Sequence, residues 1–256
     1  MFSALYESLA VADAEVRKLR RDPTELLSRA IQPVLWLVVF GQVFSTVRGI
    51  PTGQLRYLDY MAPGILAQSI LFSSIFYGIA VIWERDLGIV HKLLVTPAHR
   101  TALVFGKALA ATLRALVQAL VVYLIAAALH VAVRLEPLAI VMVICSVCIG
   151  ACIFSTFSLV IACLVKTRER FMGIGQVLTM PLFFASNAIY PLDLMPPWLK
   201  VLAAINPLTY LVDTLRSGMI VGGVSHYPLT TSFGVMIAVF AVLLIVGARL
   251  YPNLAT

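Results

Sequence analysis

Charged side chains are scarce in this 256-residue chain. Asp, Glu, Lys and Arg together make up 12% of the residues, whereas 61% are hydrophobic and the mean hydropathy is +0.97. Soluble domains carry about 25% charged residues, so the composition excludes an ordinary soluble domain and predicts an all-α polytopic membrane protein. The formal charge of +7 is explained by the positive-inside bias of such proteins, so no nucleic-acid partner is expected.

Reactive and metal-binding side chains are also few. The chain has four cysteines, and Cys145, Cys148 and Cys152 share one face of an apolar run at helical spacing. No histidine or acid lies near them in sequence, so we interpret them as packing residues and expect neither a metal site nor a catalytic site. Gly106-Lys107-Ala108 lacks both the upstream glycine and the Ser or Thr of a phosphate-binding loop, so no nucleotide site is expected on this chain.

Six long apolar runs make up most of the chain. Each is close to the ~20 residues that cross ~30 Å of hydrocarbon, and backbone in lipid must hydrogen-bond within itself, so we expect six transmembrane helices. No Asp, Glu, Lys or Arg is expected in the inner part of any span, with Arg114 at the cytoplasmic rim of the third. The expected spans are 31–47, 61–83, 115–133 with an interfacial extension from 101, 138–165, 171–189 and 230–248.

The segment 3–28 has apolar residues at helical spacing but is too charged to span a membrane. It is predicted to be an amphipathic helix in the interface, where Arg17, Arg20 and Arg21 either steer a partner protein or hold anionic lipid headgroups. Most Lys and Arg residues lie in the segments that flank one side of the six runs. This bias places both termini and the loop 84–107 in the cytoplasm.

Two polar segments interrupt the apolar pattern. The region 190–229 contains two short apolar pieces separated by Asn206-Pro207, which fits a re-entrant helical hairpin on the outer side or two amphipathic helices lying flat on the outer leaflet. Asp213 and Arg216 in it are expected to form an exposed local pair of little energetic value. The loop 84–107 alternates charged and apolar residues, so it either docks into a groove of a second protein or is a plain solvated loop.

Both polar segments resemble those of one transporter family. Residues 93–100, LLVTPAHR, resemble the first cytoplasmic loop of ABC-2 type exporter permeases, and 195–219, MPPWLKVLAAINPLTYLVDTLRSGM, resemble the region before their last helix. Within the family the chain is similar to the daunorubicin-resistance and nodulation-factor export branches. The resemblance implies one transmembrane domain over 1–256 in the bacterial cytoplasmic membrane. It also implies a second permease copy, most simply a homodimer, and two cytoplasmic ATPase subunits that bind the ATP and Mg.

The resemblance also implies roles for individual residues. The expected ATPase-coupling surface consists of Glu84, Leu87, Gly88, Leu93, Leu94, Thr96, Pro97 and Arg100. The expected outer gate consists of Asn187, Pro191, Trp198, Asn206 and Tyr210. The apolar spans suit export of a hydrophobic or amphipathic substrate, such as a drug, a lipid or a lipid-linked glycan. Two alternatives stay open at this point: an ion-coupled secondary carrier or channel, and a membrane scaffold subunit that transports nothing.

Overall fold

The structure is a computed structural model that describes residues 31–45, 55–90, 100–165 and 167–255. These residues are almost entirely helical, and the extended pairing among them is a single isolated bridge between Val133 and Ile220. The chain is helical from Ile31 and continues through η1 (Trp36–Phe40), α3 (Gly41–Ser45), α4 (Tyr57–Asp86), α6 (Arg100–Ala128), α7 (Pro137–Leu164), α8 (Arg168–Phe184), η2 (Leu192–Leu194), α9 (Pro197–Ile205), α10 (Pro207–Met219), α11 (Leu229–Leu250) and η3 (Tyr251–Ala255).

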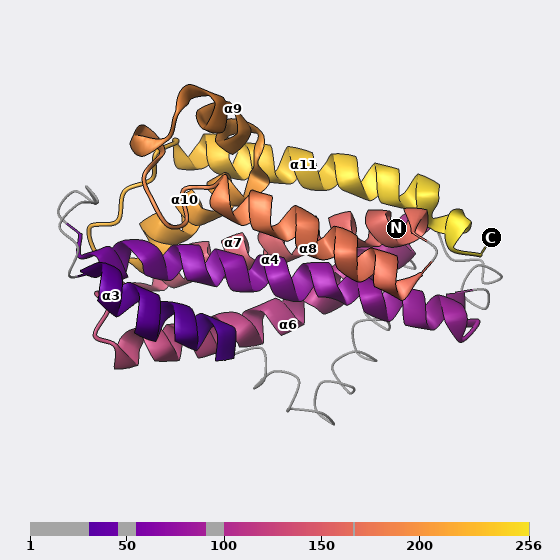
Figure 1. The fold of residues 1–256 in the computed structure, drawn as a ribbon, viewed down its shortest axis with the longest axis horizontal. Helices are drawn as coiled ribbons and strands as arrows, with labels where there is room; N and C mark the ends of the chain where they lie inside the picture. The colour runs from indigo at the N-terminus through magenta and orange to yellow at the C-terminus, as the bar shows by residue number, and fades with distance from the viewer. Residues whose placement is uncertain (1–30, 46–54, 91–99, 166, 256) are drawn as a thin grey trace.

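The long helices lie side by side in one elongated bundle. In Figure 1, α4, α6, α7, α8 and α11 run along its long axis, while α9 and α10 gather at the end where α4 begins. The described C-terminal residues lie at the opposite end, where α4 finishes. The bundle therefore has two distinct ends, which we name the α9 end and the Asp86 end after α9 and the last residue of α4.

Four helices, α4, α6, α7 and α11, are long and apolar enough to cross a membrane. The chain is therefore a multi-pass membrane protein, as its composition predicts. The other two expected spans are shorter in the described residues: an apolar helix covers Ile31–Phe44, and α8 has 17 residues. A count of six spans stays a prediction.

The third expected span has different bounds from those that the sequence predicts. The predicted interfacial extension and the span form one continuous helix, α6, which ends at Ala128 and not at Val133. The chain turns directly after it, where His130 has a φ of 55°. Because the helix starts at Arg100, Arg114 lies halfway along it and not at its rim. The expectation that every span lacks charge in its inner part stays a prediction for α6.

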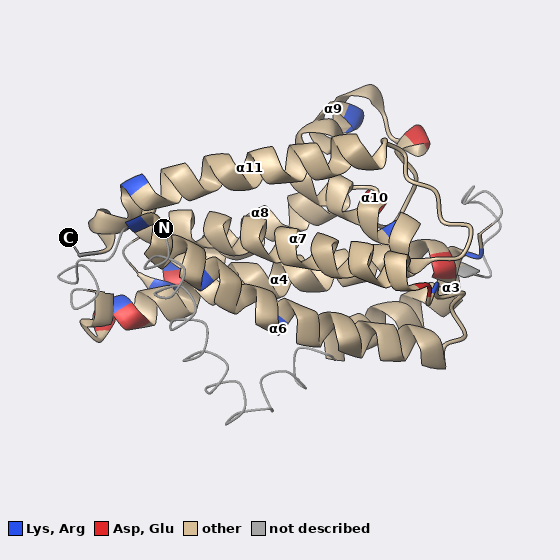
Figure 2. Cartoon of the chain, turned by 180° about the vertical axis from the view of Figure 1, so that it is seen from behind, with Lys and Arg blue, Asp and Glu red and all other residues tan. Residues whose placement is uncertain are grey.

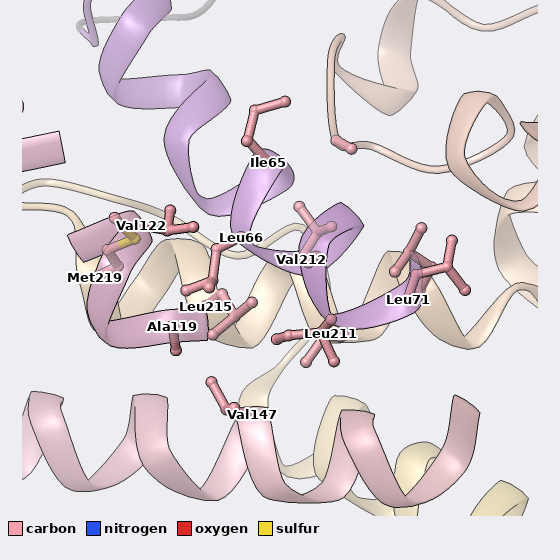
Figure 3. Packing of buried hydrophobic residues seen from close by; sticks show 14 of the residues in the cluster. Ile65, Leu66, Leu71, Ala119, Val122, Val147, Leu211, Val212, Leu215 and Met219 are labelled. Carbon is pink, nitrogen blue, oxygen red and sulfur yellow. The ribbon is translucent and has the colours of Figure 1, made fainter. Parts of the chain in front are cut away.

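The largest core forms around α10. Figure 3 shows side chains of this helix packed between those of α4, α6 and α7. In a lipid environment such packing is driven by close van der Waals contact, because the bilayer is as apolar as the core. The buried side chains in this contact are Leu211, Val212, Leu215 and Met219 of α10, Ile65, Leu66 and Leu71 of α4, Ala119 and Val122 of α6, and Val147 of α7.

The two short helices predicted between 190 and 229 both form, and the chain breaks between them at Asn206. They differ in burial. Nearly all of α10 is buried, whereas α9 buries Ala203 alone among its described residues and leaves Trp198 66% exposed. The pair of helices is therefore anchored through α10, which belongs to the core of the bundle, and a re-entrant hairpin stays a prediction.

A second core lies at the Asp86 end. It joins Tyr77, Val81 and Ile82 of α4 to residues of α6 and α7, and it includes Tyr251 and Leu254 of η3. Both η3 side chains are almost fully buried. The C-terminal turn therefore packs against the last turns of α4, a contact that the apolar pattern of the sequence did not predict.

Candidate functional site

The charged residues of the described chain lie mostly at the two ends of the bundle (Figure 2). At the Asp86 end, the ammonium group of Lys107 in α6 donates to Glu84 Oε2 in the last turn of α4. Lys107 is buried, and Glu84 is partly buried. A buried lysine without its carboxylate would leave an uncompensated charge, so this pair fastens α6 to α4.

A second ionic contact joins α4 to α8. Asp86 accepts from the guanidinium of Arg168 at 2.7 Å and from that of Arg85 at 3.1 Å. The Arg168 guanidinium also lies over the ring of Trp83, 3.8 Å from its centroid, and Arg85 Nη1 donates to the carbonyl of Val165 at 3.3 Å. The end of α4 is thus tied to the connection between α7 and α8. Sequence reasoning missed Arg168, although the run Lys166, Arg168 and Arg170 was a signal for a second basic segment on this side.

The expected ATPase-coupling surface is described in part. Leu87 is exposed directly after α4, and Gly88 follows with a φ of 71°, a conformation that favours glycine. Arg100 is exposed as the first residue of α6. Glu84, by contrast, is engaged with Lys107. The remaining residues of that surface, Leu93, Leu94, Thr96 and Pro97, lie outside the described residues, as do the helix 3–28 and Arg17, Arg20 and Arg21.

At the α9 end, a polar cluster links α10 to the segment after α8. Asp213 accepts from Asn187 Nδ2 at 2.6 Å and from the backbone N–H of Tyr227 at 2.9 Å. Arg216 Nη2 donates to the Asn187 carbonyl at 2.7 Å, and its Nη1 lies 3.7 Å from Asp213 Oδ1. From α4, the Tyr60 hydroxyl donates to the same carbonyl at 3.1 Å, and the Arg216 guanidinium lies 3.9 Å from the centroid of its ring.

The expectation of an exposed Asp213–Arg216 pair is wrong. Asp213 is 0% exposed and Arg216 is 4% exposed, because α10 is inserted into the bundle and does not lie on its surface. Burial changes the energetics of the pair, since removing one partner of a buried ion pair leaves a charge without compensation. Burial also raises the pKa of Tyr227, with Tyr210 and Asp213 as smaller causes.

A neighbouring contact fixes the start of α4 to the turn after α6. Arg56 binds Asp59 through Nε at 2.9 Å and Nη2 at 3.0 Å, and it also donates to the carbonyl of His130 at 2.5 Å. Asp59 Oδ1 accepts from the backbone N–H of Ala132 at 3.1 Å. The carboxylate of Asp59, itself buried, therefore holds this turn against α4.

The residues expected to form an outer gate lie in two different settings. Asn206 caps α10 by accepting from Leu208 N at 3.0 Å, while its Nδ2 donates to the Leu182 carbonyl at the end of α8 at 2.6 Å. The Tyr210 hydroxyl donates to the carbonyl of Ala204 at 2.7 Å. Asn187, Asn206 and Tyr210 are buried at the junction of α8, α9 and α10, whereas Pro191 is partly exposed and Trp198 lies on the exposed face of α9.

No group of three His, Cys, Asp or Glu residues within the described ranges is arranged to hold a metal ion. The ionic contacts at the Asp86 end and the polar cluster at the α9 end each join helices to one another, and both involve α4. The described chain is thus a helical membrane body with ionic contacts at each end.

This architecture is that of a multi-pass membrane protein, and the sequence comparisons identify its family. A family model described as ABC-2 type transporter matches residues 6–220, and the chain belongs to that family. A transport permease ycf38 of Cyanophora paradoxa is 32% identical over 205 residues, which cover 78% of this chain and 69% of the relative.

Two bacterial relatives are more distant. The inner membrane transport permease YadH of Escherichia coli K12 is 24% identical over 216 residues, covering 81% of this chain and 80% of the relative. The doxorubicin resistance ABC transporter permease DrrC of Mycobacterium tuberculosis is 27% identical over 208 residues, covering 79% and 72%. Membership of the family makes this chain the membrane subunit of an ABC transporter, whose ATP-binding subunit is a separate protein.

Proposed function

We propose that this chain is the permease subunit of an ABC exporter that moves a hydrophobic or amphipathic molecule out of the cytoplasm. The domain over 1–256 would be a single unit in a bacterial inner membrane with both termini inside. Two permease copies would pair with two ATPase subunits, which supply the ATP and Mg sites. The relative named for doxorubicin resistance supports a drug-like substrate, and the permease names of the other relatives support transport in general.

The observation that supports this most is the continuity of α4. This helix runs without interruption for 30 residues, about 45 Å at 1.5 Å per residue, from Tyr57 to Asp86. Its last turn carries Glu84 and leads directly to Leu87 and Gly88 of the expected coupling surface. A rigid helix of this length transmits a displacement at one end to the other, which a flexible loop does not.

The far end of α4 is attached to the expected outer gate. Tyr60 donates to the Asn187 carbonyl at 3.1 Å, and Tyr57 donates to the Ile189 carbonyl at 3.2 Å. Gly64 of α4 lies so close to the segment after α8 that a Cβ at this position would overlap the backbone of Ala188. A push on the end of α4 would therefore reach Asn187 and, through it, α10. We infer that ATP-driven movement at the coupling surface opens the outer side by this route.

The experiment compares charge-changing substitutions in the expected coupling surface with one at the α9 end. The permease is co-expressed with its ATPase, and the recovered ATPase and its ATP hydrolysis are measured after purification in lipid nanodiscs. Leu94→Asp and Arg100→Glu should each reduce the recovered ATPase by about tenfold, which corresponds to ~1.4 kcal/mol of binding free energy. The matched control is Arg134→Glu, which breaks the exposed Arg134–Glu136 pair at the α9 end and should leave recovery unchanged.

The outcomes separate the three classes of function. Normal recovery of the ATPase with both loop variants would refute the coupling surface. Uptake of substrate by vesicles that contain the permease alone, without nucleotide, would instead support an ion-coupled carrier. A stable complex that hydrolyses ATP but moves no substrate would support a scaffold.

A further inference from the structure

The short helix η3 packs into the Asp86 end of the bundle (Figure 1). It follows α11 directly and contacts α4, α7 and α11. Tyr251 is 0% exposed and Leu254 is 1% exposed. Both belong to the second core, which also contains Val81 and Ile82 of α4 and Val90 after that helix. η3 therefore lies against the end of α4 that leads to the expected coupling surface.

The hydroxyl of Tyr251 is unusual in this apolar core. It is buried, and it has no hydrogen-bond partner among the residues that the structure describes. A buried hydroxyl without a partner costs free energy, and a phenylalanine ring would fill nearly the same space without that cost. An unsatisfied group of this kind calls for an explanation, and a contact made in another conformation of the chain supplies one.

A carboxylate lies close enough to Tyr251 to affect the ionisation of its hydroxyl. Burial raises the pKa of Tyr251, and the negative charge of Glu84 raises it further. Glu84 accepts from Lys107 through Oε2, and an ionised carboxylate can accept at both of its oxygens. A hydrogen bond from a hydroxyl to an ionised carboxylate is stronger than one between neutral groups. Glu84 thus has Lys107 as its partner in this structure and the phenol of Tyr251 as a neighbouring donor.

These two donors lie on different elements. Lys107 belongs to α6, whereas Tyr251 follows α11, where its backbone N–H donates to the Gly247 carbonyl. A displacement of the end of α4 relative to α6 would lengthen the contact between Glu84 and Lys107, and hydrogen bonds weaken steeply outside their normal geometry. A partly buried carboxylate that loses its donor costs free energy unless another donor replaces it.

We propose that Tyr251 is a positioning residue for ATP-driven coupling. Its hydroxyl donates to Glu84 when the ATPase has displaced the end of α4, whereas Lys107 holds Glu84 when the ATPase is free of nucleotide. The last turn of α4 is then held in both positions. This rests on the proposed function and deepens it, because it names the residue that holds the displaced end of α4.

The test measures hydrogen–deuterium exchange by mass spectrometry on the complex of the full-length permease and its ATPase in lipid nanodiscs. The nucleotide-free complex is compared with the complex trapped by ATP and vanadate. The amides of residues 83–88 report on the last turn of α4, where the N–H of Leu87 donates to the Trp83 carbonyl at 3.0 Å. Loss of a contact that holds this turn lets it open more often, which speeds exchange.

Tyr251→Phe should affect only the trapped complex. Without nucleotide the variant should exchange as the parent does, because the hydroxyl has no partner within the described chain. In the trapped complex, exchange at 83–88 should be about tenfold faster, the effect of losing one hydrogen bond to a charged group. SDS unfolding of the permease alone should show no loss of stability, since the substitution removes an unsatisfied hydroxyl.

Two further variants complete the comparison. Tyr123→Phe, the matched control, removes another buried hydroxyl without a described partner, near the other end of α6, and should exchange as the parent does in both states. Lys107→Met should show the reverse of Tyr251→Phe. It should exchange about tenfold faster at 83–88 without nucleotide and as the parent does in the trapped complex, where Tyr251 holds Glu84.

Three results would overturn the proposal. The first is parent-like exchange of Tyr251→Phe in the trapped complex. The second is equally faster exchange of this variant in both states, which would mean that Tyr251 only fills space. The third is faster exchange of Lys107→Met in both states, which would mean that no second donor reaches Glu84.

Failure of the proposed function would give a different pattern. If the permease recovers no ATPase, or if ATP and vanadate change the exchange of no permease peptide in the parent complex, the proposed function is overturned and this proposal with it. If the parent complex responds to trapping and Tyr251→Phe matches it in both states, the role of Tyr251 alone is overturned.

Discussion

The Asp213–Arg216 pair gives the sharpest quantitative prediction. Both side chains are buried in α10, so replacing Asp213 with Asn removes the counter-charge of a guanidinium that cannot lose its proton. The substitution keeps the shape of the side chain and one oxygen that can still accept from Asn187 or from Tyr227 N. The expected loss in free energy of unfolding is about 3–5 kcal/mol, the range for breaking a buried ion pair from one side.

The reverse substitution should cost less. In Arg216→Met the Asp213 carboxylate keeps its bonds from Asn187 Nδ2 at 2.6 Å and Tyr227 N at 2.9 Å, so the expected loss is about 1–3 kcal/mol. The double variant carries neither charge and retains an acceptor for these donors. It should therefore be more stable than Asp213→Asn alone, with a coupling energy of about 1–3 kcal/mol.

The assay is unfolding by SDS in mixed micelles, followed by circular dichroism, for the parent, both single variants and the double variant. A parallel cycle on Arg134 and Glu136, an exposed ion pair at the same end, serves as the control and should give about 0–1 kcal/mol. Additive losses at Asp213 and Arg216 would refute the reasoning, because they would show that the two charges do not stabilise one another in a dry site.

Three further changes test the attachment of α4. Gly64→Ala places a methyl group against backbone and should cost about 1–3 kcal/mol in unfolding free energy, whereas Gly234→Ala, where no atom lies near, should be neutral or slightly stabilising. Glu84→Gln should destabilise the fold by about 3 kcal/mol, and adding Lys107→Met should recover part of that loss, as SDS unfolding would show. Arg168→Ala should leave the unfolding free energy within about 1 kcal/mol, because the side chains of the Arg168–Asp86 pair are 36% and 37% exposed, yet it should lower ATP-driven transport. Equal transport in parent and variant would contradict a role in coupling.

The sequence predicted the helices well where hydrophobic runs and helix breakers define them. The break at Asn206-Pro207 and the two short helices around it are observed, since Pro207 has no N–H to donate and suits the first position of a helix, and Asn206 caps that helix. The bounds of α6 were harder to predict. A helix of 29 residues can carry Arg114 at its centre when the guanidinium reaches an aromatic ring of a neighbouring helix, which hydropathy does not register.

Contacts between segments that are far apart in the sequence could not be predicted from the hydrophobic pattern. Asp213 and Arg216 are three residues apart on one helix, which is equally compatible with a surface pair and with a buried one. Their burial follows from the insertion of α10 between α4 and α7, a tertiary event. The pairing of Asp86 with Arg168 likewise joins two segments that are 82 residues apart, and each segment alone reads as an ordinary polar loop.

The placement of ionic contacts along α4 bears on how the transporter works. The interior face of α4 is apolar over most of its length, and its ionic contacts lie at its first and last turns. Between them, the Ser158 hydroxyl of α7 accepts from Gly78 N at 3.0 Å and donates to the Ile75 carbonyl. Apolar contacts in a membrane slide at small cost because they have no required geometry, whereas the hydrogen bonds at Tyr60 and the ion pair at Glu84 hold one arrangement. Under the proposed function, a helix held in this way would move as one body when an ionic end is displaced. We therefore expect substitutions at the two ends of α4 to alter the coupling of ATP hydrolysis to transport. Conservative apolar substitutions midway along α4 should alter stability and leave this coupling unchanged.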